Sequence, residues 1–188
     1  MNKKKLIEVL NKEYTKLPKM TKGWSLSSRF VPAIGPLDAK VMVIGQAPGR
    51  IEDIEQKPFV GTSGNFLNRL IGLAGLEREN VYIASVVQFF PPKNRVPTRH
   101  EIELCSRFLF KQMKIVNPRV VILLGSVACK TVLDMDRIAS VRGTVVKKDG
   151  ITYLLSLHPA AAVRIRTKMP LMEGDFSRFR HIIKSAIA

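Results

Sequence analysis

Cysteine is scarce in this 188-residue sequence, and long apolar runs are absent. Cys105 and Cys129 are its two cysteines, too few for a disulfide framework or a structural metal cluster. Both lie in helix-like segments, which favours core thiols. No stretch approaches the roughly 18 consecutive apolar residues that a membrane span needs, so we expect no membrane association. The N-terminal lysines are not followed by the apolar segment of a signal peptide, and we expect an intracellular, cytoplasmic protein.

Acidic residues are also few, 15 against 31 basic residues, which leaves a net charge of +16. The excess is spread along the whole chain rather than held in a tail. Basic globular domains favour polyanionic partners, most often nucleic acid, because Lys and Arg neutralise phosphates and release counterions. A solvated basic surface with no cognate polyanion is the alternative.

Strand and helix patterns alternate along the chain, and 46% of its residues are hydrophobic, enough for one globular domain with a sizeable core. The expected strands are 41–45, 81–87, 119–124 and a hairpin pair, 143–148 and 151–156. The expected helices are 4–15, 63–75, 98–116, 126–133 and 174–187. This order predicts an α/β fold, a three-layer α/β/α sandwich with a central, mostly parallel four-stranded sheet. We expect residues 1–188 to form one domain, in which 1–38 are a basic N-terminal helix and arm.

Loops with chemically useful residues follow three of these strands. The first reads Gly45-Gln46-Ala47-Pro48-Gly49, continues through Glu52-Asp53 and ends in Pro58-Phe59-Val60-Gly61. Its spacing fits neither common phosphate-binding motif, and its parts suit a flat polar ring. The second loop covers Ser85 to Arg95, and the third begins at His158. Because the carboxyl ends of parallel strands open onto one crevice, we expect the three loops to meet there.

The sequence Gly45-Gln46-Ala47-Pro48-Gly49-x-x-Glu52-Asp53 resembles the first motif of the uracil-DNA glycosylase superfamily. It is closest to the iron–sulfur type called family four, whose usual form is G-E-A-P-G-x-x-E-D. Pro91-Pro92-x-Asn94-Arg95 resembles that family's next block, and His158-Pro159-Ala160-Ala161-x-x-Arg164 resembles its last. The blocks occur in family order over roughly residues 25–165.

The resemblance implies a DNA repair enzyme that flips uracil or another deaminated base out of DNA and hydrolyses its N-glycosidic bond. We expect it to act as a monomer. The residues implied to be catalytic are His158, Glu52 and Gln46. Those implied to bind the base are Gly45, Gln46, Phe59, Ser85 and His158. Those implied to bind DNA are Lys93, Arg95, Pro159, Ala162, Val163, Arg164 and Arg166.

By resemblance, His158 and the backbone of the Gly45–Gln46 turn donate hydrogen bonds to uracil O2. Phe59 stacks on the base, or it is simply a core residue. Glu52 orients the attacking water or stabilises the cationic sugar; alternatively it is an acid at a helix start that balances Arg50. Residues 159–164 match the loop that wedges into the duplex, where Ala162-Val163 would form a small wedge suited to weakened pairs or single strands.

The chain departs from the family at the iron–sulfur ligands. Their four positions fall at Met20, Gly23, Phe89 and Cys105, and one thiolate cannot hold a cubane cluster. We therefore predict no iron–sulfur cluster, no metal and no other cofactor. Met20 and Phe89 are expected to fill the vacated volume as a small hydrophobic plug.

Two further departures concern the chemistry. Gln46 stands where family four normally has Glu, and Ser85 stands where it has the asparagine that reads the uracil edge. A hydroxyl cannot make that two-point contact, so we expect relaxed or altered base choice, such as hypoxanthine or xanthine. Two other functions stay open: a DNA-binding relative that has lost catalysis, and a basic α/β protein acting on RNA or free nucleotides.

Overall fold

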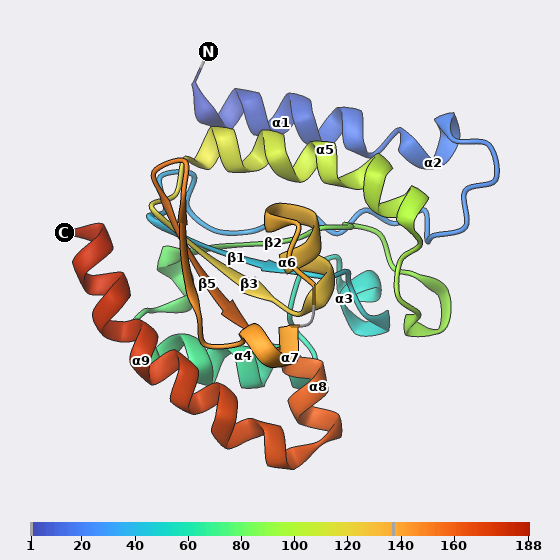
Figure 1. The fold of residues 1–188 in the computed structure, drawn as a ribbon. Coiled ribbons are helices and arrows are strands. Elements are labelled where there is room, and N and C mark those ends of the chain that lie inside the picture. Colours follow the sequence, from blue (N-terminus) through green and yellow to red (C-terminus); the bar gives the residue numbers. More distant parts are fainter. Residues whose placement is uncertain (1, 137) are drawn as a thin grey trace.

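The computed structural model describes residues 2–136 and 138–188 (Figure 1). Its strands are β1 (Val41–Gly45), β2 (Val81–Ser85), β3 (Val120–Leu124), β4 (Val145–Lys148) and β5 (Ile151–Ser156). The α-helices are α1 (Lys3–Tyr14), α2 (Leu17–Met20), α3 (Arg50–Glu55), α4 (Thr62–Leu73), α5 (Arg99–Val116), α6 (Ser126–Leu133), α7 (Ile138–Val141), α8 (Pro159–Arg164) and α9 (Met169–Ile187). Short 3-10 turns lie at η1 (Arg78–Asn80), η2 (Pro92–Asn94) and η3 (Arg166–Lys168).

One sheet organises these elements, with strand order β2-β1-β3-β5-β4. β2, β1, β3 and β5 run parallel, and β4 pairs antiparallel with β5. The predicted mostly parallel sheet in a layered α/β fold is therefore confirmed, although the sheet has five strands rather than four. The additional strand is the antiparallel edge strand β4, which joins β5 through the turn at Asp149-Gly150 and is mostly exposed.

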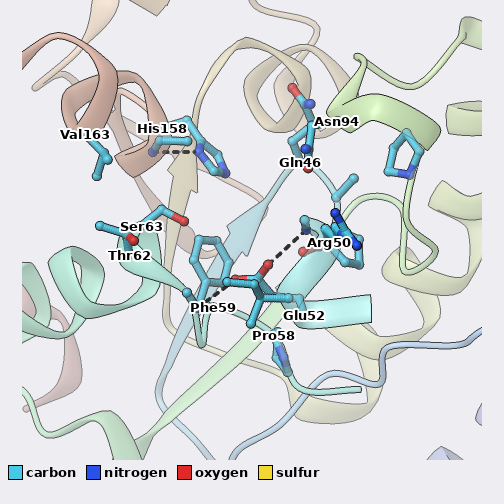
Figure 2. A pocket seen from close by; sticks show the side chains of 18 of the residues that line it. Gln46, Arg50, Glu52, Pro58, Phe59, Thr62, Ser63, Asn94, His158 and Val163 are labelled. Carbon is cyan, nitrogen blue, oxygen red and sulfur yellow. Dashed lines mark hydrogen bonds between the residues drawn. The ribbon is translucent and has the colours of Figure 1, made fainter. Parts of the chain in front are cut away.

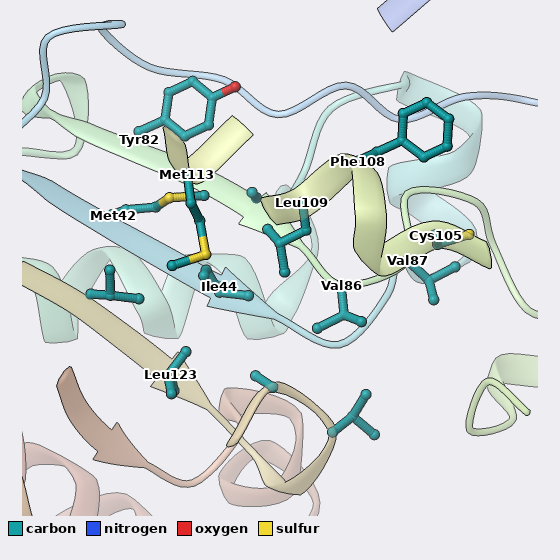
Figure 3. Packing of buried hydrophobic residues seen from close by; sticks show 14 of the residues in the cluster. Met42, Ile44, Tyr82, Val86, Val87, Cys105, Phe108, Leu109, Met113 and Leu123 are labelled. Atoms are coloured by element: carbon teal, nitrogen blue, oxygen red, sulfur yellow. The ribbon is translucent and has the colours of Figure 1, made fainter. Parts of the chain in front are cut away.

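Alternate residues of the parallel strands point to opposite faces of the sheet. Met42, Ile44 and Leu123 join the core beneath α1, α5 and α6, part of which Figure 3 shows. Val43 and Ile122 join a second core, beneath α4, α8 and α9. Figure 1 shows these two groups of helices on either side of the sheet. Because both faces are covered, the central strands β1 and β3 carry no polar side chains, as is usual for buried parallel strands.

The N-terminal arm covers the open edge of the sheet at β2. Ile34 and Ile83 exchange two backbone hydrogen bonds, and Val31 N–H donates to the carbonyl of Gln88. The arm therefore pairs the backbone groups of an edge strand that would otherwise be exposed. Most of the arm that follows the first helix is irregular, but α2 is a short helix within it.

Most expected boundaries lie within two residues of the observed ones. The helix α5 begins with a capping box, since Thr98 accepts from Glu101 N–H and the Glu101 carboxylate accepts from Thr98 N–H. The last helix begins at Met169 rather than at 174, with Pro170 in its first turn, where proline is tolerated. The segment after His158, predicted as a loop, is the helix α8.

Candidate active site

The three predicted loops meet around a cavity of about 610 Å³ at the carboxyl ends of β1, β2 and β5. Gln46, Glu52, Phe59, Ser85 and His158 all line it. In Figure 2, His158 and Val163 stand on one side, Gln46, Asn94 and Arg50 on the other, and Phe59 and Glu52 below. Five of the predicted base-binding and catalytic residues therefore face one space.

Gly45, at the end of β1, allows Phe59 and His158 to approach each other. A Cβ at Gly45 would lie 2.6 Å from the Phe59 ring, so a larger residue there would force the ring to shift. The Phe59 ring stacks near the imidazole of His158, with centroids 5.8 Å apart. Phe59 also has a left-handed backbone (φ 53°) and packs against Gly64, whose own Cβ would collide with the Phe59 carbonyl. Phe59 is thus both a core residue and part of the cavity wall.

The imidazole of His158 has one nitrogen engaged and one unpaired. Its Nδ1 accepts a hydrogen bond from Ala160 N–H at 3.2 Å, where His158 caps the N-terminus of α8. In a neutral ring, Nε2 then carries the proton. Nε2 is buried and has no hydrogen-bond partner among the described residues. Burial, reinforced by the charge of Arg164, lowers the pKa of His158 to about 4, so the ring is a neutral donor at neutral pH.

Glu52 binds backbone amides from two segments of the first loop. One carboxylate oxygen accepts from Gly49 N–H at 3.1 Å, and the other accepts from Val60 and Gly61 N–H at 3.2 and 3.1 Å. Glu52 is nearly buried and lies in the first turn of α3, where a carboxylate is favourable. The side chain therefore braces the Phe59 loop against α3 and brings a negative charge to the cavity wall.

Ser85 and Gln46 occupy neighbouring strand ends. Ser85 is buried and pairs in register with Gly45. The strand pairing continues past this point, since Val86 and Val87 N–H donate to the carbonyls of Gly45 and Gln46, both at 3.0 Å. The turn that carries Gln46 is therefore fixed by the sheet.

The second loop contributes Asn94 to the cavity, a residue for which the sequence predicted no role. Lys93 and Asn94 both have left-handed backbone, φ 59° and 55°, and both are exposed. Lys93 is therefore accessible to DNA, as its predicted role needs. The signal for Asn94 was present in the Pro-Pro-x-Asn-Arg block, which the resemblance matched as a whole.

Arg95 is engaged within the protein. Its guanidinium donates to both carboxylate oxygens of Glu101, at 2.6 and 2.8 Å, and to the hydroxyl of Ser25 at 3.2 Å. These contacts, led by Arg95, lower the pKa of Glu101 to about 2. The network joins the arm, α5 and the second loop. Arg95 also lines the cavity, and its DNA-binding role stays a prediction.

The predicted wedge residues lie on α8 in different environments. Ala162 is fully buried against α4 and α9, so the prediction that it enters the duplex is wrong for this structure. Pro159 is buried as well, whereas Val163 lines the cavity and Arg164 and Arg166 are exposed. Ile165, which the sequence did not single out, is 48% exposed between the two arginines.

The four positions of the iron–sulfur ligands do not form a metal site. Cys105 is buried beside Tyr14, and burial raises the pKa of its thiol to about 11. Phe89 is buried and packs edge-on against Tyr14 and Trp24. Met20, expected in the same plug, is 75% exposed, so that part of the prediction is wrong. Tyr14 and Trp24 contact Phe89 instead.

Within residues 2–136 and 138–188 there is no group of three or more His, Cys, Asp or Glu side chains that could hold a metal ion. The side chains at the family's cluster positions therefore do not fit an iron–sulfur cluster. Across the same residues, no helix is long and apolar enough to cross a membrane.

The chain is similar in sequence to a known protein family and to several of its members. The model of the uracil DNA glycosylase superfamily matches residues 32–184. A type-4 uracil-DNA glycosylase of Saccharolobus solfataricus is 37% identical over 172 residues, covering 86% of this chain and 80% of the relative. One from Archaeoglobus fulgidus is 34% identical and covers 80% of both chains. A type-5 uracil-DNA glycosylase of Pyrobaculum aerophilum is 36% identical, covering 73% of this chain and 68% of the relative.

Proposed function

The chain belongs to the uracil DNA glycosylase superfamily, and we propose that it is a monofunctional DNA glycosylase that removes uracil from DNA in base excision repair. The observation that carries this proposal is the buried, unpaired Nε2 of His158 beside a cavity large enough for a nucleobase. Its partner is DNA, which agrees with a net charge of +16. We expect it to act as a monomer inside the cell.

The reaction replaces one bond at the sugar. The C1′–N1 bond breaks, and its electron pair leaves with uracil as an anion whose charge rests largely on O2. The oxygen of a water molecule bonds to C1′ and loses its proton, while uracil takes one up. Catalysis then depends on stabilising a negative base and a positive sugar at the same moment.

His158 is suited to stabilise the anion. A neutral imidazole with its proton on Nε2 donates a hydrogen bond to O2, and because burial lowers its pKa to about 4, it stays neutral at working pH. A preorganised donor needs no rearrangement when the charge forms, and losing one typically costs about 3 kcal/mol. The backbone of the Gly45–Gln46 turn, fixed by pairing to β2, supplies further donors.

Phe59 provides the stacking surface for the flipped base. Its ring lies against Gly45, its backbone lies against Gly64 of α4, and it lines the same cavity as His158. Stacking of a base on an aromatic ring is worth roughly 1–3 kcal/mol, which offsets part of the cost of flipping.

Glu52 stabilises the cationic sugar by its charge. Both of its oxygens already accept backbone hydrogen bonds, so it acts from a fixed position. Gln46, which replaces the usual family glutamate, contributes a neutral carboxamide near the water site. Of the three carboxylates in the usual family-four motif, this chain therefore keeps Glu52 and Asp53. Asp53 pairs with Arg29, and Glu52 is the one that lines the cavity.

Ser85 sets base choice. Its single hydroxyl rotates to donate or accept but cannot bind two edge atoms at once, so the cavity reads the uracil edge less strictly than an asparagine would. We expect hypoxanthine or xanthine to be cleaved as well, at a measurable fraction of the rate for uracil.

A cleavage assay tests the function. Single-stranded and duplex oligonucleotides carrying uracil, hypoxanthine or xanthine are incubated with the protein, treated with alkali and resolved on a gel. Strand breaks at uracil support the proposal, and breaks at the other bases support the role of Ser85. Tight, salt-sensitive DNA binding with no abasic product from any substrate would instead identify a relative that has lost catalysis.

A further inference from the structure

We infer that a second groove, beside the base cavity, binds the unpaired nucleotide next to the target on the same strand. This inference rests on the proposed glycosylase function. The groove has a volume of about 510 Å³ and lies between the N-terminal arm, α3 and the loop that leads into η2. We call it the arm groove; its walls include Leu26, Arg29, Arg50, Ile54, Phe90 and Pro92.

The arm groove continues the base cavity. Arg50, the first residue of α3, lines both spaces. Along α3, Ile51 lines the base cavity and Ile54 lines the groove. Across from α3, Pro91 lines the cavity and Pro92 lines the groove. A strand whose uracil occupies the cavity therefore has a continuous path over the start of α3 into the groove.

The walls of the groove offer apolar surface suited to a base. Ile54 is 60% exposed, although it is a large aliphatic residue on a short surface helix. Phe90 is half-buried beside the buried Leu26, and Pro92 is exposed. An unpaired base has two apolar faces, and proteins that hold single strands stack such bases on aromatic and aliphatic side chains.

The charges around the groove fit a phosphate backbone. Arg29 donates from Nε at 2.8 Å to the fully buried Asp53 yet keeps 58% of its side chain exposed. Arg50 is exposed and takes part in none of the ion pairs found among the described residues. Asp53 also lines the groove but is already paired with Arg29, so Arg50 is the groove arginine without a counter-charge. Apolar walls beside Arg50 favour a nucleotide over an apolar protein segment, because Arg50 would lose hydration against such a segment without gaining a counter-charge.

This placement has a consequence for substrate choice. A nucleotide can enter the groove only when its base is unpaired, so the groove supplies binding energy on single strands and frayed ends. If the groove binds this nucleotide equally tightly in the enzyme–substrate complex and in the transition state, its binding energy lowers KM and leaves kcat unchanged. The small wedge at Val163 gives little help in opening a duplex, and the groove favours the same substrates.

The test compares two variants that introduce the same charge. Ile54→Asp places a carboxylate in the groove, and Val9→Asp places one on α1, at a residue that is also aliphatic, helical and 44% exposed. Both sites are exposed, so the fold is kept, which equal Tm values verify. The probes are single-stranded 15-mers with one central deoxyuridine, intact or with either neighbouring base replaced by an abasic tetrahydrofuran residue.

On the intact probe, we expect Ile54→Asp to raise KM at least about fivefold with little change in kcat, and Val9→Asp to leave both unchanged. Removing the base on one particular side should raise the wild-type KM by a similar factor. It should also erase most of the difference between the wild type and Ile54→Asp. An unchanged KM for Ile54→Asp, or an equal rise in both variants, would overturn the inference.

The outcome for the groove is separable from the outcome for the proposed function. If the wild type releases uracil but Ile54→Asp matches it on every probe, the glycosylase stands and the groove fails. If the wild type releases no uracil, the proposed function fails. Fluorescence anisotropy with a uracil-free 15-mer then still measures the groove, through weaker binding by Ile54→Asp than by Val9→Asp.

Discussion

The Phe59 ring lies almost parallel to the imidazole of His158, with a 26° angle between their planes and 5.8 Å between their centroids. The two rings come from segments almost 100 residues apart, and the absence of a side chain at Gly45 lets them meet. One ring offers a stacking face and the other a hydrogen-bond donor. Their arrangement is that of a binding site for a flat base with an acceptor on its edge.

Removing the imidazole should slow chemistry more than binding. We predict that His158→Ala lowers the single-turnover rate of uracil release at least about tenfold, because a preorganised donor to O2 is lost. DNA affinity should persist, since the basic surface is unchanged. Rapid-quench cleavage and anisotropy measure the two quantities, and His100→Ala, at an exposed histidine on α5, is the control. Unchanged cleavage in His158→Ala would remove this residue from the mechanism.

The buried imidazole should also make stability depend on pH. The folded-state pKa of His158 is about 4, below the ordinary value of 6.5, so the unfolded chain binds the extra proton between these values. The stability that the neutral ring retains above pH 6.5 is therefore lost as pH falls toward 4. Urea unfolding at pH 7 and pH 5 should show a smaller drop in unfolding free energy for His158→Gln than for the wild type. Equal drops in both proteins would contradict this assignment.

The loops at the strand ends could be predicted from the sequence because short residue patterns mark where each strand ends. The apolar run 41–44 followed by Gly45 marked a buried strand and its end, and Thr98 with Glu101 marked the start of α5. Parallel strands then place such ends at one edge of the sheet. The cavity with Gly45, Phe59 and His158 follows from these two steps.

Other features depended on packing that no local pattern encodes. Ala162 and Val163 are adjacent and similar in sequence terms, yet one is buried and the other lines the cavity, because helix α8 turns Ala162 toward the α4/α9 core. Met20 and Phe89 looked equally apolar, but Tyr14 and Trp24 contact Phe89 and leave Met20 exposed. The engagement of Arg95 with Glu101 likewise required the structure.

The Arg95–Glu101 pair should contribute measurably to stability. Glu101 is nearly buried, so Arg95→Ala leaves its carboxylate without the strongest of its partners, and we expect a loss of about 2–3 kcal/mol. Arg99→Ala removes the exposed Arg99–Glu103 pair and should cost about 0.5 kcal/mol or less. Urea unfolding at pH 7 measures both. Similar losses in the two variants would show that the Ser25–Arg95–Glu101 network carries no special weight.

We predict that the protein contains no iron–sulfur cluster and releases uracil without one. Protein produced with added iron and purified without oxygen is expected to be colourless, because Cys105 is the single cysteine at the four ligand positions. Cys105→Ala should cost about 1 kcal/mol of stability, as for one deleted buried group, and leave uracil release unchanged. Metal analysis and cleavage assays check both. Stoichiometric iron that Cys105→Ala removes would overturn the prediction.

A larger side chain at position 163 should make the wedge more effective on duplex DNA. Val163 lines the cavity on α8, and a larger side chain there would fill more of the gap that a flipped base leaves in a duplex. We predict that Val163→Leu raises the cleavage rate at U·A pairs several-fold and changes the rate on single-stranded DNA little, since no gap exists there. Ala162→Leu is the matched control: it adds bulk to a fully buried site and should lower stability by about 1–3 kcal/mol instead. A parallel rise on both kinds of DNA in Val163→Leu would assign Val163 to the base pocket rather than to the wedge.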